Sequence, residues 1–222
     1  MQELKALAKS FINLLYPLRC LGCSKQLDAL NELNLCDQCI AAIKKNAMPP
    51  FELDTPSVMV YSACIYEGVF KELIHGFKYN GKLALAKIFV TLLESCIKEN
   101  PEMLEADVVT AVPLHRSRMR QREFNQSSVL ANKLAGIYGL PVKNVLKKIK
   151  KTKYQNELTK SERLVNLKNA FKVCNPAAIE GKRILLIDDV MTTGATLSEC
   201  AGTLLSNGAK KVTCLTLARG IQ

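Results

Sequence analysis

The sequence lacks the features of a membrane or repeat protein. No apolar run in its 222 residues approaches the roughly 18 residues of a membrane-spanning helix. It contains no internal repeat and no low-complexity tract, which argues against a solenoid or a largely disordered chain. Residues 1–19 carry Lys5, Lys9 and Arg19 and do not resemble a secretory signal. We therefore expect a cytoplasmic protein without a membrane span.

Acidic and aromatic residues are both scarce. The 31 Lys and Arg outnumber the 20 Asp and Glu, which gives a formal net charge of +11. Such a charge favours polyanionic partners: nucleic acid, an anionic membrane surface or a phosphate-rich substrate. Aromatic residues make up only 6% of the chain, and tryptophan is absent. Base stacking should therefore add little to any nucleic-acid affinity, which would come mostly from phosphate contacts.

The chain has nine cysteines, and without a secretory signal these indicate a reducing compartment, where thiols serve metals or catalysis more often than disulfides. Four of them form two C-x-x-C pairs separated by twelve residues: Cys20 and Cys23, then Cys36 and Cys39. Two such pairs can hold Zn²⁺ tetrahedrally, and four protein ligands leave no open position, so we predict one structural zinc. A dithiol redox pair is the alternative. The remaining five cysteines are predicted to lie in the core: Cys64, Cys96, Cys174, Cys200 and Cys214.

The most informative stretch runs from residue 183 to residue 197. The apolar run Ile184–Ile187 predicts a strand buried on both faces of a parallel sheet. Asp188 and Asp189 follow at its C-terminal end, where open α/β sheets bind ligands. A loop of small residues comes next: Thr192, Thr193, Gly194, Ala195 and Thr196. Its N–H groups and hydroxyls can hold a phosphate together with the N-terminus of the following helix.

Carboxylates repel phosphate, so two acids beside a phosphate cradle require an explanation. A sugar phosphate provides one, because the acids can accept hydrogen bonds from sugar hydroxyls while the loop holds the phosphate one sugar-width away. The stretch is similar to the phosphoribosyl-pyrophosphate (PRPP) motif of type I phosphoribosyltransferases. A nucleotide-binding P-loop is a rival, since Gly76–Lys82 nearly matches its consensus. Leu83 stands where that motif needs a hydroxyl, so we interpret the match as coincidental.

Two basic segments are candidates for phosphate contact. A predicted strand, Asp107–Val112, leads into residues 113–122, which hold four arginines suited to bidentate phosphate binding. Residues 143–153 hold six lysines, which form either a solvated run or a mobile loop that closes over the active site. Residues 155–169 would complete such a lid. The lid and nucleic-acid candidates are Lys147, Lys148, Lys150, Lys151 and Arg163.

The periodicity of apolar residues predicts the other elements. An amphipathic helix is expected over residues 3–16, with a linker from Met48 to about Pro56. The later elements are a strand at 58–66, helices at 68–79, 82–98 and 124–138, a helix from Leu197 that Gly208 can end, and a last strand at 211–218. We expect an N-terminal helix and zinc-binding module over residues 1–50, followed by an α/β domain over residues 51–222.

Motifs along nearly the whole chain resemble those of the ComF family, phosphoribosyltransferase-like proteins associated with DNA uptake in bacterial natural competence. The matching blocks are the two cysteine pairs, Val112-Pro113-Leu114, Arg118 with Arg122, Phe124-Asn125-Gln126, Thr152-x-x-Gln155-x-x-Leu158, Arg163-x-x-Asn166, Ala170-Phe171, the PRPP motif and Thr216-Leu217-Ala218-Arg219. One position departs from the pattern, because the family usually has glycine where this chain has Glu123.

The resemblance implies a type I phosphoribosyltransferase-like fold, a parallel sheet flanked by helices, with the zinc module in the hood position. It implies that Asp188 and Asp189 are catalytic, stabilising positive charge on the ribose as pyrophosphate leaves. Mg²⁺ would be bound mostly by the diphosphate and water. The loop from Pro113 to Arg118 would hold the pyrophosphate. The PRPP-binding candidates are Pro113, Leu114, His115, Arg116, Arg118, Arg122 and the loop 192–196.

Two functions remain open at this point. The first is an enzyme that transfers phosphoribosyl from PRPP to an acceptor that the sequence does not name. The second is a competence protein that handles single-stranded DNA and in which PRPP or ribose 5-phosphate binding is regulatory or vestigial. The acid pair favours the first and the net charge of +11 favours the second. Competence-machinery proteins are possible partners of either.

Overall fold

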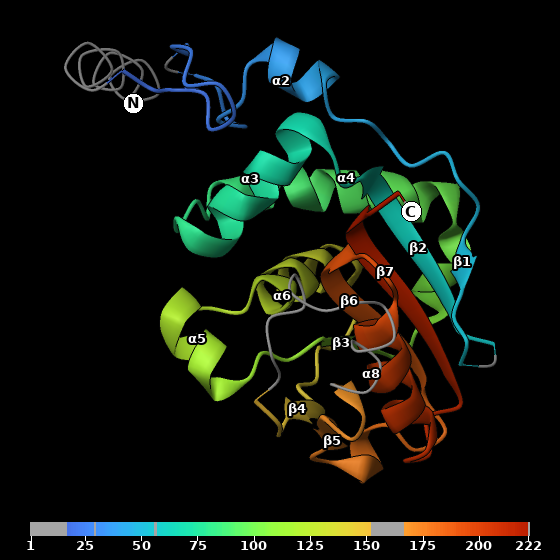
Figure 1. Cartoon of the computed structure of the whole chain (residues 1–222). Coiled ribbons are helices and arrows are strands. Elements are labelled where there is room, and N and C mark those ends of the chain that lie inside the picture. The colour runs from blue at the N-terminus through green and yellow to red at the C-terminus, as the bar shows by residue number, and fades with distance from the viewer. Residues whose placement is uncertain (1–16, 29, 56, 152–166, 222) are drawn as a thin grey trace, which may run out of the picture.

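The structure, a computed structural model, describes residues 17–28, 30–55, 57–151 and 167–221 (Figure 1). The predicted helix at 3–16, the motif beginning at Thr152 and the candidate Arg163 lie outside these residues. No helix in the described ranges is long and apolar enough to cross a bilayer. The division of the chain at residue 50 stays a prediction.

A five-stranded sheet forms the centre of the molecule, in the order β1-β2-β7-β6-β3. Its strands are β1 (Phe51–Glu52), β2 (Met59–Ile65), β3 (Val108–Ala111), β6 (Arg183–Met191) and β7 (Lys211–Arg219). β2, β7, β6 and β3 are parallel, and only the edge strand β1 is antiparallel. The expected sheet is therefore confirmed, and its central strands are the apolar runs from which it was predicted.

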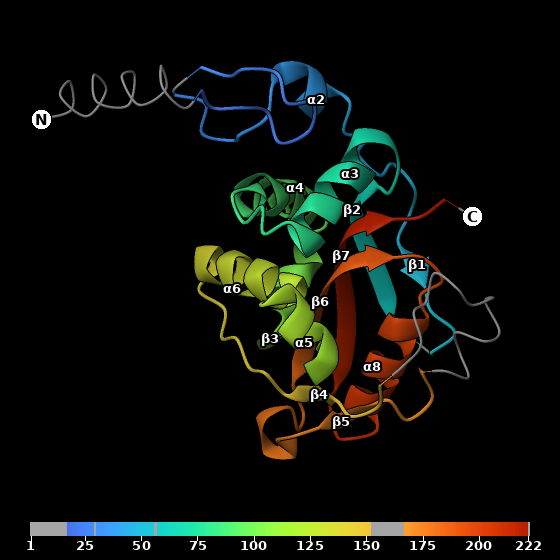
Figure 2. The same cartoon turned by 60° about the vertical axis from the view of Figure 1, so that its left-hand side comes forward.

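Helices cover both faces of this sheet (Figures 1 and 2). One face carries α3 (Gly68–Tyr79), α4 (Leu85–Glu99) and α6 (Gln126–Tyr138), and the other carries α8 (Ala195–Leu205). Because neighbouring strand residues face opposite sides, Leu185 and Ile187 join the core beneath α4 and α6, whereas Ile184 and Leu186 join the core beneath α8. This pattern explains the continuous apolar run in β6.

Aromatic packing fixes α3 against α4. Phe77 makes edge-on contacts with Phe89 and Phe124, at ring-centroid distances of 5.2 and 5.7 Å. Phe70 contacts Phe89 in the same way at 5.6 Å. Edge-on aromatic pairs stabilise by about 0.5–1.5 kcal/mol beyond the burial of their area. The contacts hold α3 in place above the C-terminal ends of the strands.

Short elements complete the fold. α2 (Asp37–Ala41) belongs to residues 17–50, here called the cysteine segment, which carry the four paired cysteines. The 3₁₀ turns η1 (Pro101–Glu105) and η3 (Pro176–Ala178) precede β3 and β6. A separate antiparallel ribbon, β4 (Leu146–Lys148) with β5 (Phe171–Val173), packs beside α8. α5 (Arg116–Arg122) lies between β3 and α6 in the chain.

The structure corrects the expectation that the arginines of residues 113–122 lie in a loop. Residues 116–122 form α5, whose N-terminus is capped by the His115 ring, which accepts a hydrogen bond from the Ser117 N–H at 3.3 Å. The helix ends at Glu123, which adopts a left-handed conformation with φ of 65°. Glycine adopts this conformation without strain, so the departure from the family pattern falls at the position where glycine fits best.

The lysine segment, for which a solvated run and a mobile lid were both open, contains one buried member, Lys148, whereas its other described lysines are exposed. Residues 146–148 pair with β5, and the two-residue period of a strand turns Leu146 and Lys148 inward and Lys147 outward. Lys148 is only 7% exposed.

The prediction that Cys174 lies in the core is wrong, because this residue is exposed. The other four cysteines predicted for the core are buried.

Candidate functional site

The acid pair lies at the C-terminal end of β6, but within the strand rather than after it, because β6 continues to Met191. The Ser127 hydroxyl of α6 donates to Asp188 Oδ1 at 2.8 Å, and the Asp189 N–H donates to the same oxygen at 2.9 Å. Asp189 forms an ion pair with Lys78 of α3, with Nζ and Oδ1 2.8 Å apart. Two elements that flank the sheet therefore hold the two carboxylates.

The electrostatics of the pair raise the pKa of one carboxyl group into the neutral range. Burial and the neighbouring charge of Asp189 raise the pKa of Asp188 from its usual value to about 7, although the hydrogen bond from Ser127 works in the opposite direction. A carboxyl with this pKa changes charge close to neutrality. Asp188 can therefore exist as an acid or as a base under the conditions of the cell.

The small-residue loop follows directly after β6. Gly194 adopts a φ of 78° as the N-cap of α8, and a Cβ at this position would lie 2.8 Å from Leu53 Cδ2. Residues 190–197 and Asp188 enclose a hollow of about 20 Å³. Both the left-handed conformation and the close contact explain why glycine stands here. The predicted phosphate cradle lies at the N-terminus of an eleven-residue helix.

A cavity of about 290 Å³, here called the acid-pair cavity, opens beside the two carboxylates. Its lining comes from elements between Tyr66 and Thr196. Its lining includes these predicted site residues: Pro113, Leu114, Arg118, Arg122, Lys148, Asp188, Asp189, Thr192 and Thr196. Arg118 and Arg122 are one helical turn apart on α5 and so face the same way. The structure thus brings most of the predicted PRPP-binding residues into one place.

Some predicted residues lie outside this lining. His115 instead caps α5, and Arg116 is exposed. Lys147, Lys150 and Lys151 are exposed as well. Helix geometry explains the division among the arginines, because residues 116 and 120 face away from the side that carries 118 and 122.

The sequence analysis missed several lining residues, which are Tyr66, His75, Tyr79, Val112, Ser127, Phe171 and Val190. The His75 and Tyr79 rings contact each other with centroids 4.7 Å apart. Arg122 lies over the Tyr79 ring at 4.6 Å and donates to the Tyr79 hydroxyl at 2.7 Å. His75 and Tyr79 come from α3, whereas Ser127 belongs to α6, Phe171 to β5 and Val190 to β6.

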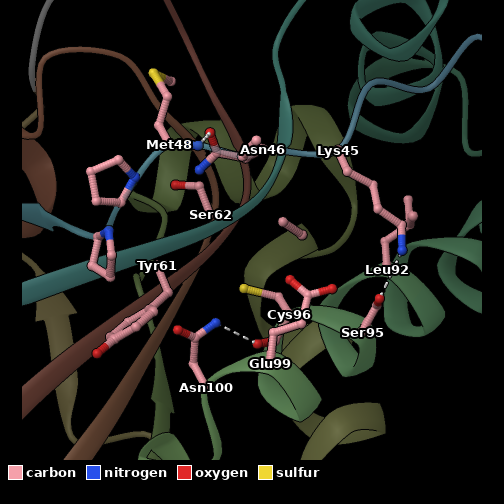
Figure 3. A pocket seen from close by; sticks show the side chains of 14 residues that line it. Lys45, Asn46, Met48, Tyr61, Ser62, Leu92, Ser95, Cys96, Glu99 and Asn100 are labelled. Atoms are coloured by element: carbon pink, nitrogen blue, oxygen red, sulfur yellow. Dashed lines mark hydrogen bonds between the residues drawn. The ribbon is translucent and has the colours of Figure 1, made fainter.

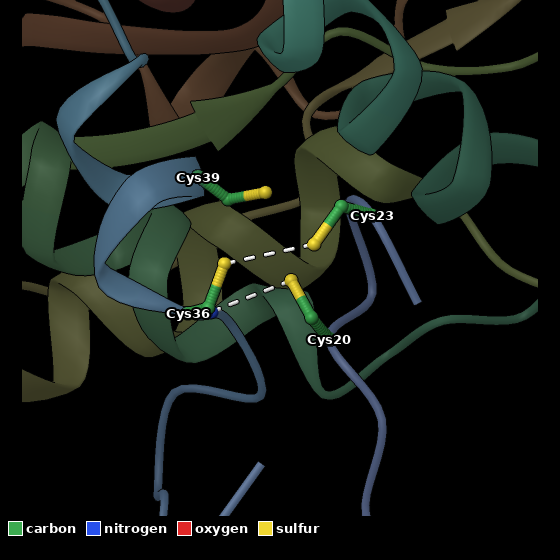
Figure 4. Close-up of side chains that lie close together, drawn as sticks. All are labelled: Cys20, Cys23, Cys36 and Cys39. Carbon is green, nitrogen blue, oxygen red and sulfur yellow. Dashed lines mark hydrogen bonds between the residues drawn. The ribbon is translucent and has the colours of Figure 1, made fainter. Parts of the chain in front are cut away.

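The four cysteines of the two pairs form a second candidate site (Figure 4). Their sulfur atoms all lie within 4.8 Å of one another, and those of Cys23 and Cys36 are 3.6 Å apart. A tetrahedral zinc with bonds of about 2.3 Å would place its sulfurs roughly 3.8 Å apart. Burial acts against ionisation of Cys20, but nearby backbone N–H groups, led by that of Cys23, lower its pKa to about 6. The cluster fits a metal ion.

The cysteine segment packs on α3 and α4, on the side away from α8 (Figures 1 and 2). A Cβ on Gly22 would lie 2.9 Å from Cys39 Sγ and 3.2 Å from Val69 Cγ2 of α3. Lys82, just after α3, donates to the Leu21 carbonyl at 3.0 Å. No described residue of 17–50 lines the acid-pair cavity, so on this side the lining comes from α3.

A further cavity of about 270 Å³ lies between residues 45–50, β2 and α4 (Figure 3). Its buried polar side chains already have partners. The Ser62 hydroxyl lies 2.7 Å from that of Thr216, and the Tyr61 hydroxyl donates to Glu102 at 2.8 Å. These groups therefore do not require a ligand.

Comparison with known proteins identifies a domain family in the C-terminal part of the chain. Residues 125–222 match the phosphoribosyl transferase domain family. A solved structure of orotate phosphoribosyltransferase from Aeropyrum pernix aligns with 82% of the chain and 78% of its own length, at 18% identity and a TM-score of 0.39.

Curated relatives are similar over more of the sequence. The chain is 30% identical to DNA utilization protein YhgH of Escherichia coli O6:H1 over 90% of its length and 89% of the relative. It is 30% identical to Competence protein F of Haemophilus influenzae, with 66% of each chain covered. It is 34% identical to Competence protein ComFC of Bacillus subtilis, over 71% of this chain and 63% of that one. The chain thus spans about two thirds of the two competence proteins. On this similarity it belongs to the ComF family, with a phosphoribosyltransferase domain.

Proposed function

We propose that the acid-pair cavity binds PRPP or ribose 5-phosphate together with Mg²⁺. The proposal rests on one observation: two carboxylates and a glycine-centred loop at a helix N-terminus border the same cavity. The loop 192–196 would hold the 5-phosphate, and Asp188 and Asp189 would accept hydrogen bonds from the ribose hydroxyls. These two are the only acids in the described lining of the cavity, so they are the residues available to a Mg²⁺ ion on the diphosphate.

The proposed reaction is transfer of phosphoribosyl to an acceptor. The bond from the ribose carbon to pyrophosphate breaks, the electron pair leaves with the pyrophosphate oxygen, and positive charge builds on the ribose. The carboxylates stabilise that charge. The guanidinium groups of Arg118 and Arg122 suit the departing pyrophosphate. Bound Mg²⁺ would neutralise part of the negative charge of the diphosphate.

Calorimetry with PRPP and Mg²⁺ tests this proposal. We expect the double variant Asp188→Asn/Asp189→Asn to bind at least about tenfold more weakly, because two charge-assisted hydrogen bonds are lost. Lys210→Met, an exposed residue remote from the cavity lining, serves as the control and should bind as the wild type does. Equal affinity for PRPP in the double variant and the wild type would contradict the assignment of Asp188 and Asp189 to the PRPP site. Release of pyrophosphate, with and without added nucleic acid, would separate turnover from binding alone.

We further propose that the protein acts in DNA uptake, since its relatives are named competence and DNA utilization proteins. A second candidate function, non-catalytic handling of single-stranded DNA, is favoured by the exposed basic side chains on α5 and around the β4–β5 ribbon. Their contacts would be with phosphates and so independent of base sequence.

We also propose that the four-cysteine cluster holds one structural Zn²⁺. The sulfur positions and the donor set support this, because four thiolates match the preference of zinc and leave no site for substrate. The ion would stabilise the short segment around α2, which has little regular secondary structure of its own.

A further inference from the structure

The start of α6 carries three successive polar side chains that are almost completely buried. Asn125 is 8% exposed, Gln126 1% and Ser127 4%. Ser127 donates to Asp188, and Asn125 caps α6 and donates to the Val112 carbonyl at 2.9 Å. The amide of Gln126 contacts neither of these partners and bonds to α3 and α5 instead.

Gln126 joins the ends of two other helices. Its Nε2 donates to the Lys78 carbonyl in the last turn of α3 at 3.3 Å, and its Oε1 accepts from Arg122 Nη1 at the end of α5 at 3.2 Å. The last carbonyl groups of a helix have no partner within it, so the amide satisfies one of them. A single side chain thus connects the C-terminal ends of α3 and α5 to the start of α6.

The two residues that Gln126 contacts both line the acid-pair cavity, whereas Gln126 itself does not. The Arg122 guanidinium is also held by the Tyr79 hydroxyl at 2.7 Å and by the Tyr79 ring at 4.6 Å. Lys78 is held at its backbone by Gln126 and at its ammonium group by Asp189, 2.8 Å away. Gln126 therefore acts on the cavity only through its neighbours.

Packing alone does not explain an amide at this position. Methionine has a similar length and would fill the space without a polar group. Glutamine is mostly exposed in proteins, and burial of its amide costs free energy unless the amide is hydrogen-bonded. The two hydrogen bonds of Gln126 offset this cost only while α3 and α5 keep their present spacing. The residue thus favours this one arrangement of the cavity wall.

We propose that Gln126 is a positioning residue of the acid-pair cavity, which holds Lys78 and Arg122 at the spacing that the ligand requires. Together with Ser127, it connects the first turn of α6 to both carboxylates of the pair, since Ser127 bonds to one and Lys78 to the other. Identification of the ligand as PRPP rests on the proposed function. The bridge between α3 and α5 does not depend on it.

Calorimetry with PRPP and Mg²⁺ measures the effect on the cavity. We expect Gln126→Met to lower PRPP affinity about tenfold, because Lys78 and Arg122 are no longer held in place. The matched control is Asn100→Leu, which removes another amide that donates to a helix carbonyl, that of Cys96, at 2.9 Å. Asn100 does not line the acid-pair cavity, so this variant should bind PRPP within about twofold of wild type.

A double-mutant cycle separates positioning from a general loss of stability. If Gln126 acts through Arg122, the two substitutions share one effect, and Gln126→Met should cost less than about threefold in an Arg122→Met background. A merely structural role would give the same loss of about tenfold in both backgrounds. Thermal unfolding of each variant confirms that it is folded.

A second variant tests the same junction if Gln126→Met does not fold. Tyr79→Phe removes the hydroxyl that accepts from Arg122 and keeps the ring beneath the guanidinium. The loss of PRPP affinity in Tyr79→Phe should also shrink in the Arg122→Met background, and an undiminished loss would overturn the proposal.

Amide hydrogen exchange tests the bridge without any ligand. The Lys78 carbonyl loses its partner in Gln126→Met, so residues 76–82 at the end of α3 should exchange faster than in the wild type. Asn100→Leu should leave exchange in this segment unchanged.

The outcomes are distinct. Wild-type PRPP affinity in a folded Gln126→Met variant, or full additivity with Arg122→Met, would overturn the positioning role and leave the proposed function standing. If the wild type does not bind PRPP, the proposed function fails, and faster exchange at the end of α3 in Gln126→Met but not in Asn100→Leu would still support the bridge. Unchanged exchange in Gln126→Met would overturn the bridge whether or not PRPP binds.

Discussion

The two carboxylates of the site have different partners. Asp189 has an ammonium partner, Lys78, at 2.8 Å, whereas Asp188 has a hydroxyl and an N–H. Burial and repulsion from Asp189 raise the pKa of Asp188 to about 7. Asp188 is thus poised to change protonation near neutral pH.

The raised pKa of Asp188 makes the stability of the protein depend on pH. The folded state holds a proton on Asp188 more tightly than the unfolded state does, because its folded pKa of about 7 exceeds the usual value of 3.8. The resulting stabilisation is fully present below about pH 4 and is lost as pH rises to about 7. We expect the free energy of unfolding of the ligand-free protein to fall by on the order of 4 kcal/mol across this window through Asp188.

Chemical denaturation at several pH values measures this effect, with Asp188→Asn for comparison. The amide does not titrate, so the difference in unfolding free energy between wild type and variant should change with pH. Parallel profiles for the two proteins would contradict the raised pKa.

At the residue scale, the sequence was informative where the site is contiguous. The acids and the loop 192–196 lie within nine residues of one another, so their pattern was visible directly. Ser127, Tyr79 and Phe171 were not predicted because they come from different elements that meet only in the fold. The burial of Lys148 depends on its pairing with β5, which a run of lysines does not reveal.

At the scale of elements, the strands and most helices were predictable from apolar period and length. The α5 helix was not, because its seven residues contain four charged side chains and no apolar stripe. Its stability depends on its ends, where His115 provides the N-cap and Glu123 adopts the left-handed conformation. Capping geometry of this kind is set by tertiary context as much as by residue type.

The cysteine segment yields the second prediction. α2 has only five residues, and a helix of this length is not stable alone in water. We expect about one zinc per chain in protein purified without added metal, measured by elemental analysis. Cys20→Ser should lower zinc content and increase amide hydrogen exchange in residues 17–45, since metal binding supplies part of the folding free energy. Cys174→Ser, an exposed cysteine outside the cluster, is the control.

Two results would count against the metal assignment. One is less than half an equivalent of zinc in the wild type, with freely reactive thiols in the cluster. The other is an exchange pattern in Cys20→Ser that matches the Cys174→Ser control.

At the scale of the whole molecule, the net charge is +11, and the basic residues discussed here fall into two groups, one that lines the cavity and one that faces solvent. Arg118, Arg122 and Lys148 face the acid-pair cavity. The exposed basic side chains outside its lining include Arg116, Arg120, Lys147, Lys150 and Lys151. A sequence shows the total charge, but only the fold separates these two groups.

The third prediction uses this division. We expect weak, sequence-independent binding of single-stranded DNA, with an affinity that falls steeply as salt rises through counterion release. The triple variant Lys147→Ala/Lys150→Ala/Lys151→Ala should reduce the slope of log affinity against log salt by about two, since each lost phosphate contact contributes roughly 0.7. Fluorescence anisotropy with a labelled oligonucleotide measures this slope.

A control for the DNA experiment is Lys210→Ala/Lys211→Ala, which changes two exposed lysines at the start of β7. If the slope in the triple variant equals that of the wild type, or if no binding occurs at low salt, the exposed lysines do not contact DNA. Competition with PRPP would show that the two ligands share the rim of the cavity.

The position of α3 links the two candidate sites. One side of the helix packs on the cysteine segment, and the helix also supplies His75, Lys78 and Tyr79 to the acid-pair cavity. Removing the proposed metal would loosen the support behind α3 and, with it, the ion pair between Lys78 and Asp189. A chelator should then weaken ligand binding without entering the cavity. By thermodynamic reciprocity, a ligand bound in the cavity should raise the affinity of the cysteines for the metal by the same factor.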